Sequence, residues 1–250
     1  MERSDLILCV SRHTRRTVLD QASVTPERVL VVSNTVGDAF TPGDDSSIRQ
    51  SFGLHGKQVL LTVGRLDSRE RYKGQDRVIA AMPALVAQGH DVIYLIVGGG
   101  DDRGRLQNLA REAGVADRVR FLGELRTVQL VDVYRAADLF VMASTGEGFG
   151  ISFLEAMACG TPALGLAAGG ARDALADGAL GTIVEGADLC ESIGRLLSSP
   201  KPDRQALAAK VRTRFGRAPF QDCVKAVLER LRNSQDSFKS EIDEASALAR

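Results

Sequence analysis

The chain has 250 residues, 44% hydrophobic and 26% charged, as is usual for a soluble globular protein with a sizeable core. Its 32 lysines and arginines balance its 32 aspartates and glutamates, so no basic surface for nucleic acid is predicted. The four cysteines form no C-x-x-C pair and only three histidines are present, which argues against a metal site or a disulfide framework. The sequence shows no signal peptide and no membrane-spanning run, and we expect reduced thiols in a cytoplasmic protein.

The first 33 residues predict a small strand–helix–strand unit. Residues 6–11 (LILCVS) and 28–33 (RVLVVS) are short apolar runs typical of strands, with a helix expected over 12–21. A turn-rich stretch over 40–47 follows, which we interpret as a linker. Residues 1–46 are therefore set apart from the rest of the chain.

From residue 58 onward, predicted strands and helices alternate regularly. The strands are short continuous apolar runs, as expected when helices cover both faces of a sheet. Such alternation predicts an α/β fold with a doubly wound, Rossmann-like parallel sheet, in which ligands bind outside the carboxyl ends of the strands. Strands are expected at 59–64, 92–98, 118–123, 139–144, 162–166 and 181–184, and helices at 74–88, 104–113, 128–136, 151–159, near Arg172 and at 188–198.

Two amphipathic helices, at 202–215 and 220–231, are predicted to complete this domain, which we place at residues 47–235. The last residues, 236–250, are polar and weakly patterned, and we interpret them as a tail.

A glycine-rich loop, EGFG (147–150), runs directly into the predicted helix 151–159. Nearly every residue of that helix is small or apolar, so it should be buried on all sides, yet it contains Glu155. A lone carboxylate in such a place costs several kcal/mol, as an order of magnitude, unless a donor such as a diol pairs with it. The loop glycines would let the backbone approach a ligand, and the helix N-terminus offers N–H groups to an anion.

Glu147 and Glu155 would therefore bracket a ligand that is partly sugar and partly phosphate. The alternative is that both carboxylates are structural, with Glu147 solvated and Glu155 paired with an arginine.

The stretch EGFGISFLE resembles the E-x7-E motif of retaining glycosyltransferases of family 4, which have the GT-B fold. The motifs GRL (64–66), KG (73–74) and GG-x-x-D (169–173) accompany it in the family's order, and the resemblance covers roughly residues 4–230. It implies that the chain is the C-terminal, donor-binding half of a GT-B fold. Residues 1–46 would then be a remnant of the N-terminal acceptor domain together with the interdomain linker.

The resemblance also implies roles for single residues. Glu155 would hold the ribose of a UDP-, GDP- or ADP-sugar, and Glu147 would contact the transferred sugar. Arg65 and Lys73 would bind the donor diphosphate in place of a metal, so neither a cofactor nor a divalent ion is expected. The other residues expected in the donor pocket are Gly64, Gly98, Leu122, Gly148, Phe149, Gly150 and Ile151.

The run GGGDDR (98–103) also permits a dinucleotide-binding interpretation. It lacks the third glycine of G-x-G-x-x-G, and Asp101 and Asp102 would repel a pyrophosphate. We therefore expect this loop to line the nucleotide pocket without holding phosphate.

The sequence thus predicts a retaining glycosyltransferase that uses a nucleotide-diphosphate sugar and a glycan or lipid-linked acceptor. A non-catalytic nucleotide-sugar-binding subunit and a sugar-nucleotide epimerase on the same fold remain alternatives. Because the strands at 6–11 and 28–33 would expose unpaired edges, we expect self-association, or pairing with an acceptor-domain chain, through residues 1–40. The protein would lie in the cytoplasm, free or peripheral at the inner membrane face.

Overall fold

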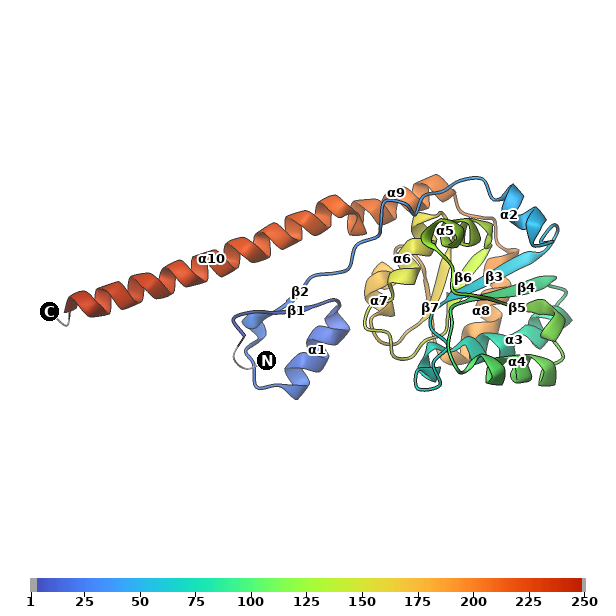
Figure 1. Cartoon of the computed structure of the whole chain (residues 1–250), viewed down its shortest axis with the longest axis horizontal. Helices are drawn as coiled ribbons and strands as arrows, with labels where there is room; N and C mark the ends of the chain where they lie inside the picture. The colour runs from blue at the N-terminus through green and yellow to red at the C-terminus, as the bar shows by residue number, and fades with distance from the viewer. Residues whose placement is uncertain (1–3, 249–250) are drawn as a thin grey trace.

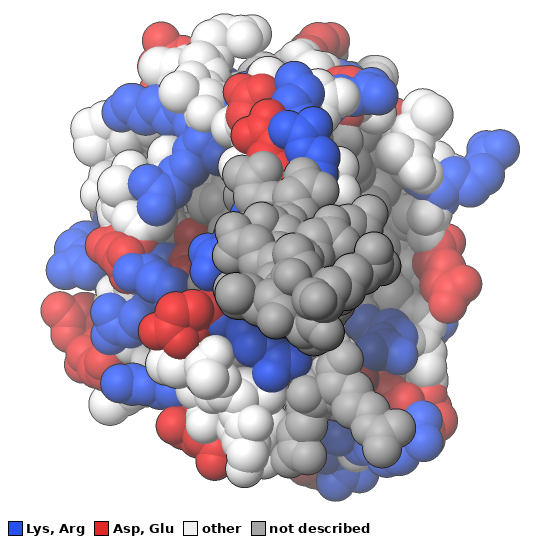
Figure 2. All heavy atoms as spheres, turned by 90° about the vertical axis from the view of Figure 1, so that its left-hand side faces the viewer, with Lys and Arg blue, Asp and Glu red and all other residues white. Residues whose placement is uncertain are grey.

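The computed structural model describes residues 4–248, and the side chains of residues 4–232. Figure 1 shows a small N-terminal unit beside a larger α/β domain, from which one long C-terminal helix projects. On the face seen in Figure 2, basic and acidic side chains are intermixed.

The larger part is built on a six-stranded sheet with the order β5-β4-β3-β6-β7-β8. Every neighbouring pair of strands is parallel, so the predicted doubly wound α/β fold is confirmed. The strands are β3 (Gln58–Val63), β4 (Val92–Val97), β5 (Val119–Gly123), β6 (Leu139–Met142), β7 (Ala163–Leu166) and β8 (Thr182–Val184).

Alternate side chains of each strand enter two separate cores. In β3, Val59 and Leu61 pack on one side and Leu60 on the other, and all three are fully buried. One core is closed by α5 (Thr127–Ala136), α6 (Ile151–Ala158), α7 (Ala171–Ala174) and α9 (Arg204–Phe215). The other is closed by α3 (Gln75–Ala87), α4 (Arg103–Glu112) and α8 (Leu189–Ser198).

The direction of strand addition reverses at β3. The chain passes from β3 to β4 and β5 on one side, then crosses to β6, β7 and β8 on the other. The loops that leave β3 and β6 therefore lie at this switch point at the carboxyl end of the sheet, the place where folds of this kind bind ligands, which we call the crevice. These two loops, residues 64–74 and 143–150, contain most of the candidate residues found in the sequence.

The N-terminal unit consists of β1 (Ile7–Cys9), α1 (Arg12–Gln21), the 3₁₀ turn η1 (Pro26–Arg28) and β2 (Val29–Val31). Its two strands pair in parallel and form a sheet separate from the main one. Leu8 in β1 is 54% exposed. The predicted strand–helix–strand is confirmed, and the two strands are shorter than the apolar runs suggested.

Residues 32–45 lead to the short helix α2 (Ser46–Ser51), which the sequence analysis had not predicted. Further 3₁₀ turns are η2 (Arg71–Lys73), η3 (Ala116–Arg118), η4 (Ala176–Gly178) and η5 (Gly186–Asp188).

The last helix, α10 (Arg217–Leu248), continues well beyond the predicted end at residue 231. No glycine or proline follows Pro219 to end it, and Pro219 itself lies in the first turn, where a missing N–H costs little. The region interpreted as a polar tail is therefore helical as far as residue 248. Within residues 4–248, no helix combines the length and the apolar character that crossing a membrane would require.

Candidate functional site

The loops after β3 and β6 are tied together at the crevice. The backbone N–H of Thr145 donates to the carbonyl of Tyr72 over 2.9 Å. Gly74 (φ 76°) lies so close to the other loop that an added Cβ would stand 2.1 Å from the carbonyl oxygen of Ala143. Only glycine allows this approach, so the KG pair brings Lys73 to the β6 loop.

Lys73 and Glu147 form an ion pair across the crevice. Lys73 Nζ lies 2.9 Å from Glu147 Oε1, and each side chain is only 13% exposed. Lys73 Nζ also lies 5.4 Å from the centre of the Tyr72 ring. The structural alternative had supposed a solvated Glu147. Instead, Glu147 is paired with the cation that is predicted to bind diphosphate.

Arg65, the second predicted cation, pairs with Glu70 over 2.6 Å. The Arg65 side chain is 71% exposed, whereas Glu70 is largely buried. The other carboxylate oxygen of Glu70, Oε2, is buried and has no hydrogen-bond partner among the described residues. Glu70 lies between the two cations along the chain and was not among the site residues predicted from the sequence.

The glycine run after β4 packs directly on the loop after β3. A Cβ on Gly98 (φ 136°) would stand 2.0 Å from the Gly64 carbonyl oxygen, and one on Gly100 (φ 145°) would stand 2.1 Å from that of Leu66. The N–H of Leu66 donates to the Gly99 carbonyl over 2.7 Å. The close approach of the two backbones thus explains why Gly98 and Gly100 are glycines, and no phosphate-binding role is needed to explain them.

The end of β5 lies against the same glycine run. Gly98 donates its N–H to the carbonyl of Gly123 over 2.8 Å. Leu122 is half-buried and packs against the core that contains α5 and α6. Gly64, Gly98 and Leu122 therefore belong to adjacent segments at the carboxyl ends of β3, β4 and β5.

The N-terminus of α6 has no side-chain cap, because its N-cap residue is Gly150 (φ 94°). Its first residue, Ile151, is 44% exposed. The prediction that this helix is buried on all sides is wrong at that residue, because the first turn faces the crevice. Phe149 is buried and its ring packs edge-on against Phe215 of α9, so its side chain belongs to the core.

Glu155 lies one turn further along α6 and is largely buried. Its Oε2 accepts a hydrogen bond from the hydroxyl of Tyr134 over 2.8 Å, whereas Oε1 has no hydrogen-bond partner among the described side chains. Burial raises the pKa of Glu155 above its usual value, and the Tyr134 hydrogen bond partly opposes that rise. The partner is thus a tyrosine, not the arginine of the structural alternative.

Gly169 and Gly170 pack directly against the backbone of the EGFG loop. The Gly170 N–H donates to the Glu147 carbonyl over 2.7 Å. A Cβ on Gly170 would stand 2.1 Å from the Gly148 carbonyl oxygen. From the opposite direction, the buried Ser11 hydroxyl donates to that same carbonyl over 2.6 Å. The EGFG loop is thus held between α7 and the N-cap of α1.

Among the residues whose side chains are described, no group of three or more His, Cys, Asp or Glu is placed to hold a metal ion.

The model of the family "Glycosyl transferases group 1" matches residues 44–214. The chain belongs to this family. Its matched range contains both crevice loops and both glutamates of the motif.

Curated relatives are about one-third identical to this chain over the aligned residues. The D-inositol 3-phosphate glycosyltransferase 2 of Catenulispora acidiphila is 38% identical over 189 residues, which is 70% of this chain and 44% of that protein. A GDP-mannose-dependent alpha-(1-6)-phosphatidylinositol monomannoside mannosyltransferase of Mycolicibacterium smegmatis is 33% identical over 210 residues, 79% of this chain and 54% of that protein. The chain therefore spans about half the length of the curated relatives it matches.

Solved structures agree with the fold. HepE of Anabaena, in complex with UDP and glucose, has a TM-score of 0.80 and 24% identity over 91% of this chain and 64% of its own. Sucrose-phosphate synthase from Thermosynechococcus elongatus has a TM-score of 0.78 and 26% identity over 93% of this chain and 60% of its own.

Proposed function

We propose that this group 1 glycosyl transferase contributes the donor site of a retaining enzyme that transfers a sugar from a nucleotide-diphosphate sugar. The observation that carries the proposal is the arrangement of α6 and the loop before it. Glu147 in the loop is paired with Lys73, and Glu155 follows one turn after the uncapped N-terminus of α6 that this loop leads into. We infer that the two carboxylates line one donor site on either side of that N-terminus.

Glu155 suits the ribose of the donor. An ionised carboxylate only accepts hydrogen bonds, and a ribose diol donates two. Oε2 is occupied by Tyr134, which leaves Oε1 for the ligand. Leu122 and Gly98, at the ends of the neighbouring strands, would lie beside the base.

The diphosphate would bind between Arg65, Lys73 and the N–H groups of Gly150 and Ile151. Helix N-termini attract anions, and cations at the same place stabilise the negative charge that grows on the leaving diphosphate. Both cations are paired with carboxylates in this structure, so a diphosphate would compete with Glu70 for Arg65 and with Glu147 for Lys73. Released from Lys73, Glu147 could accept hydrogen bonds from the transferred sugar.

The acceptor we propose carries a phosphate group. Two relatives are named for D-inositol 3-phosphate and for a phosphatidylinositol monomannoside, and both names describe such acceptors. A glycan or lipid-linked acceptor of this kind would meet the donor sugar near Glu147. Self-association, or an acceptor-domain partner chain, would act through residues 1–40.

Titration of the purified chain with UDP-, GDP- and ADP-sugars by calorimetry tests the donor site. We expect one of the three to bind, with and without a chelator. Analysis of the products with a phosphate-bearing acceptor then separates transfer from the alternatives. An unchanged donor would indicate a binding subunit, and an altered sugar on the same nucleotide would indicate an epimerase.

A further inference from the structure

A cavity of about 550 Å³ lies between α1 and the segment that contains α7 and η4. Its wall contains none of the residues predicted to bind the donor, although Arg172 and Asp173 belong to the GG-x-x-D motif (169–173). Its wall holds four arginines, three from α1 and one from α7: Arg12, Arg15, Arg16 and Arg172.

Two of the three acidic side chains of this cavity, Asp173 and Asp177, form ion pairs with Arg12. Arg12 Nε lies 2.8 Å from Asp173 and its NH2 group lies 2.7 Å from Asp177. This one arginine therefore binds both carboxylates contributed by the α7–η4 segment.

The other three arginines of the cavity form no ion pair with the carboxylates described. Arg15 donates to the carbonyls of Val29 and Pro26, which leaves its charge uncompensated. Arg16 and Arg172 have no ion pair or hydrogen bond in the part of the chain whose side chains are described, and Asp20 is the one other acid of the wall. The cavity thus presents two guanidinium groups, those of Arg16 and Arg172, that are paired with none of the described carboxylates.

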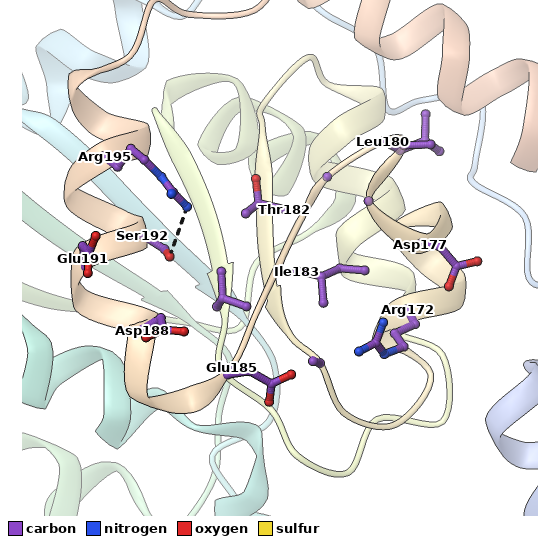
Figure 3. Close-up of a pocket in the computed structure, with 15 residues that line it drawn as sticks. Arg172, Asp177, Leu180, Thr182, Ile183, Glu185, Asp188, Glu191, Ser192 and Arg195 are labelled. Atoms are coloured by element: carbon purple, nitrogen blue, oxygen red, sulfur yellow. Dashed lines mark hydrogen bonds between the residues drawn. The ribbon is translucent and has the colours of Figure 1, made fainter.

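The backbone beside this cavity is strained. Ala176 and Asp177 have φ of 51° and 52°, a conformation that residues other than glycine seldom adopt. Such strain persists where the surrounding structure enforces it, often at ligand sites. Figure 3 shows Asp177 and Arg172 near each other at one end of the larger cavity of about 900 Å³ that runs along β8. The strained turn therefore lies between the two cavities and directs Asp177 toward Arg12.

The cavity adjoins the EGFG loop. Ser11, the N-cap of α1, donates to the Gly148 carbonyl, and the next residue, Arg12, begins the cavity wall. On the other side, Gly170 contacts Gly148 and α7 follows directly. A ligand group held in the cavity would therefore lie one short loop away from Glu147.

We propose that the cavity between α1 and α7 binds the phosphate group of the acceptor, with Arg16 and Arg172 as its ligands. This inference rests on the proposed function, since it assigns the acceptor of that same reaction. Guanidinium groups bind phosphate through paired, charge-assisted hydrogen bonds, which suits an anion with several oxygens. Arg12, held by its two aspartates, fixes the wall from which the α1 arginines project.

The phosphate could belong to a free cyclitol phosphate or to a lipid headgroup. Two arms of the experiment distinguish these sources. In the first, the chain is titrated by calorimetry with D-inositol 3-phosphate and, as the uncharged control, with inositol. In the second, its sedimentation with vesicles of phosphatidylcholine is compared with vesicles that also contain phosphatidylinositol.

The variants are Arg172→Gln, the double variant Arg16→Gln/Arg172→Gln, and Arg111→Gln as the control. Arg111 is an exposed arginine on α4, which packs on the other face of the sheet. We expect the double variant to lose about tenfold or more in affinity for the phosphate ligand, the effect of at least one charge-assisted hydrogen bond. Arg111→Gln should bind like the unaltered chain.

Nucleotide-sugar binding is measured on the same samples. It should be unchanged in every variant, because neither arginine belongs to the donor crevice. The cavity is not a phosphate site if the unaltered chain binds neither D-inositol 3-phosphate nor vesicles that contain phosphatidylinositol. The same conclusion follows if the double variant binds these ligands as well as Arg111→Gln does. A failure of the proposed function would instead appear as absence of nucleotide-sugar binding in the unaltered chain.

Discussion

The hydroxyl of Tyr134 donates a hydrogen bond to Oε2 of Glu155 over 2.8 Å, which joins the end of α5 to the middle of α6. Tyr134 is fully buried, and the loss of its hydroxyl would leave a largely buried carboxylate with one partner fewer. The tyrosine thus fixes the side chain proposed to bind ribose.

Tyr134→Phe should lower the free energy of unfolding by about 1–3 kcal/mol, the cost of leaving a buried polar group unpaired. It should also weaken nucleotide binding, because Glu155 is no longer held in place. Tyr94→Phe is the matched control, since Tyr94 is equally buried and its hydroxyl bonds to Thr62, away from Glu155. Denaturant unfolding and calorimetry should show similar instability in both variants and weakened binding only in Tyr134→Phe.

Glu155→Gln should weaken donor binding by about 1.5–3 kcal/mol, the scale of a hydrogen bond to a charged group. The amide keeps the shape of the side chain but replaces one acceptor oxygen with a donor. Calorimetry on the folded variant checks this, and unchanged nucleotide affinity would contradict the ribose role.

The same variant should alter the pH dependence of stability. Burial raises the pKa of Glu155 in the native state, so the Glu155 carboxyl ionises at lower pH in the unfolded chain than in the native one. The native state therefore loses stability as pH rises from the ordinary glutamate pKa through the raised one. Glu155→Gln removes this loss, and its free energy of unfolding relative to the unaltered chain should be higher at about pH 8 than at about pH 4. An equal difference at both pH values would show that Glu155 has no raised pKa.

Arg65→Ala should weaken binding of a nucleoside diphosphate about tenfold or more and leave nucleoside binding nearly unchanged, because it removes a phosphate partner only. Arg69→Ala is the control, since Arg69 lies in the same loop and is bonded to Asp67. A chelator should leave binding intact in both variants. Binding that a chelator abolishes and Arg65→Ala does not affect would indicate a metal site instead.

Gly170→Ala should displace the EGFG loop. The φ of Gly170 (−79°) suits alanine, so the obstacle is the clash of the new Cβ with the Gly148 carbonyl and the Cα of Phe149. Relief of that clash should cost about 1–3 kcal/mol of stability and reduce donor affinity. Gly104→Ala places its Cβ in open space and should leave both unchanged or slightly improved. Equal behaviour of the two variants would show that the Gly170 contact is unimportant.

Self-association of the chain should depend on the exposed strands of the N-terminal unit. Light scattering on the purified chain should show oligomers, and Leu8→Lys should reduce them, because a charge on β1 opposes edge-to-edge pairing. Donor binding should be unaffected, while transfer by the chain alone should be weak. A stable monomer that transfers sugar fully would overturn this expectation.

Much of the fold could be predicted from the sequence, since buried parallel strands are continuous apolar runs that stand out between polar loops. The helix over 12–21 was placed correctly because Ser11 caps it and α1 is amphipathic. The end of α10 was missed because no glycine or proline marks it, and the pattern that weakens after residue 231 does not by itself stop a helix.

The candidate site was predicted only as a set of residues. Sequence order located Arg65, Lys73, Glu147 and Glu155, and the switch of strand order at β3 brings the β3 and β6 loops together, so that Lys73 meets Glu147. Their partners depend on packing between elements distant in the chain, so no local pattern could identify them. Tyr134 belongs to another helix, and Glu70 resembles any surface glutamate until Arg65 is placed beside it.

The carbonyl of Phe215, where α9 ends, accepts hydrogen bonds from the N–H of Val36 and from the hydroxyl of Thr35. The linker from the N-terminal unit is therefore anchored at the point from which α10 departs. Further along, α10 returns to that unit, where Arg230 donates to the Glu27 carbonyl over 2.7 Å. The covalent linker and the hydrogen-bonded helix α10 thus both run from the α9–α10 junction to the N-terminal unit, so a rotation of that unit about this junction would carry α10 with it.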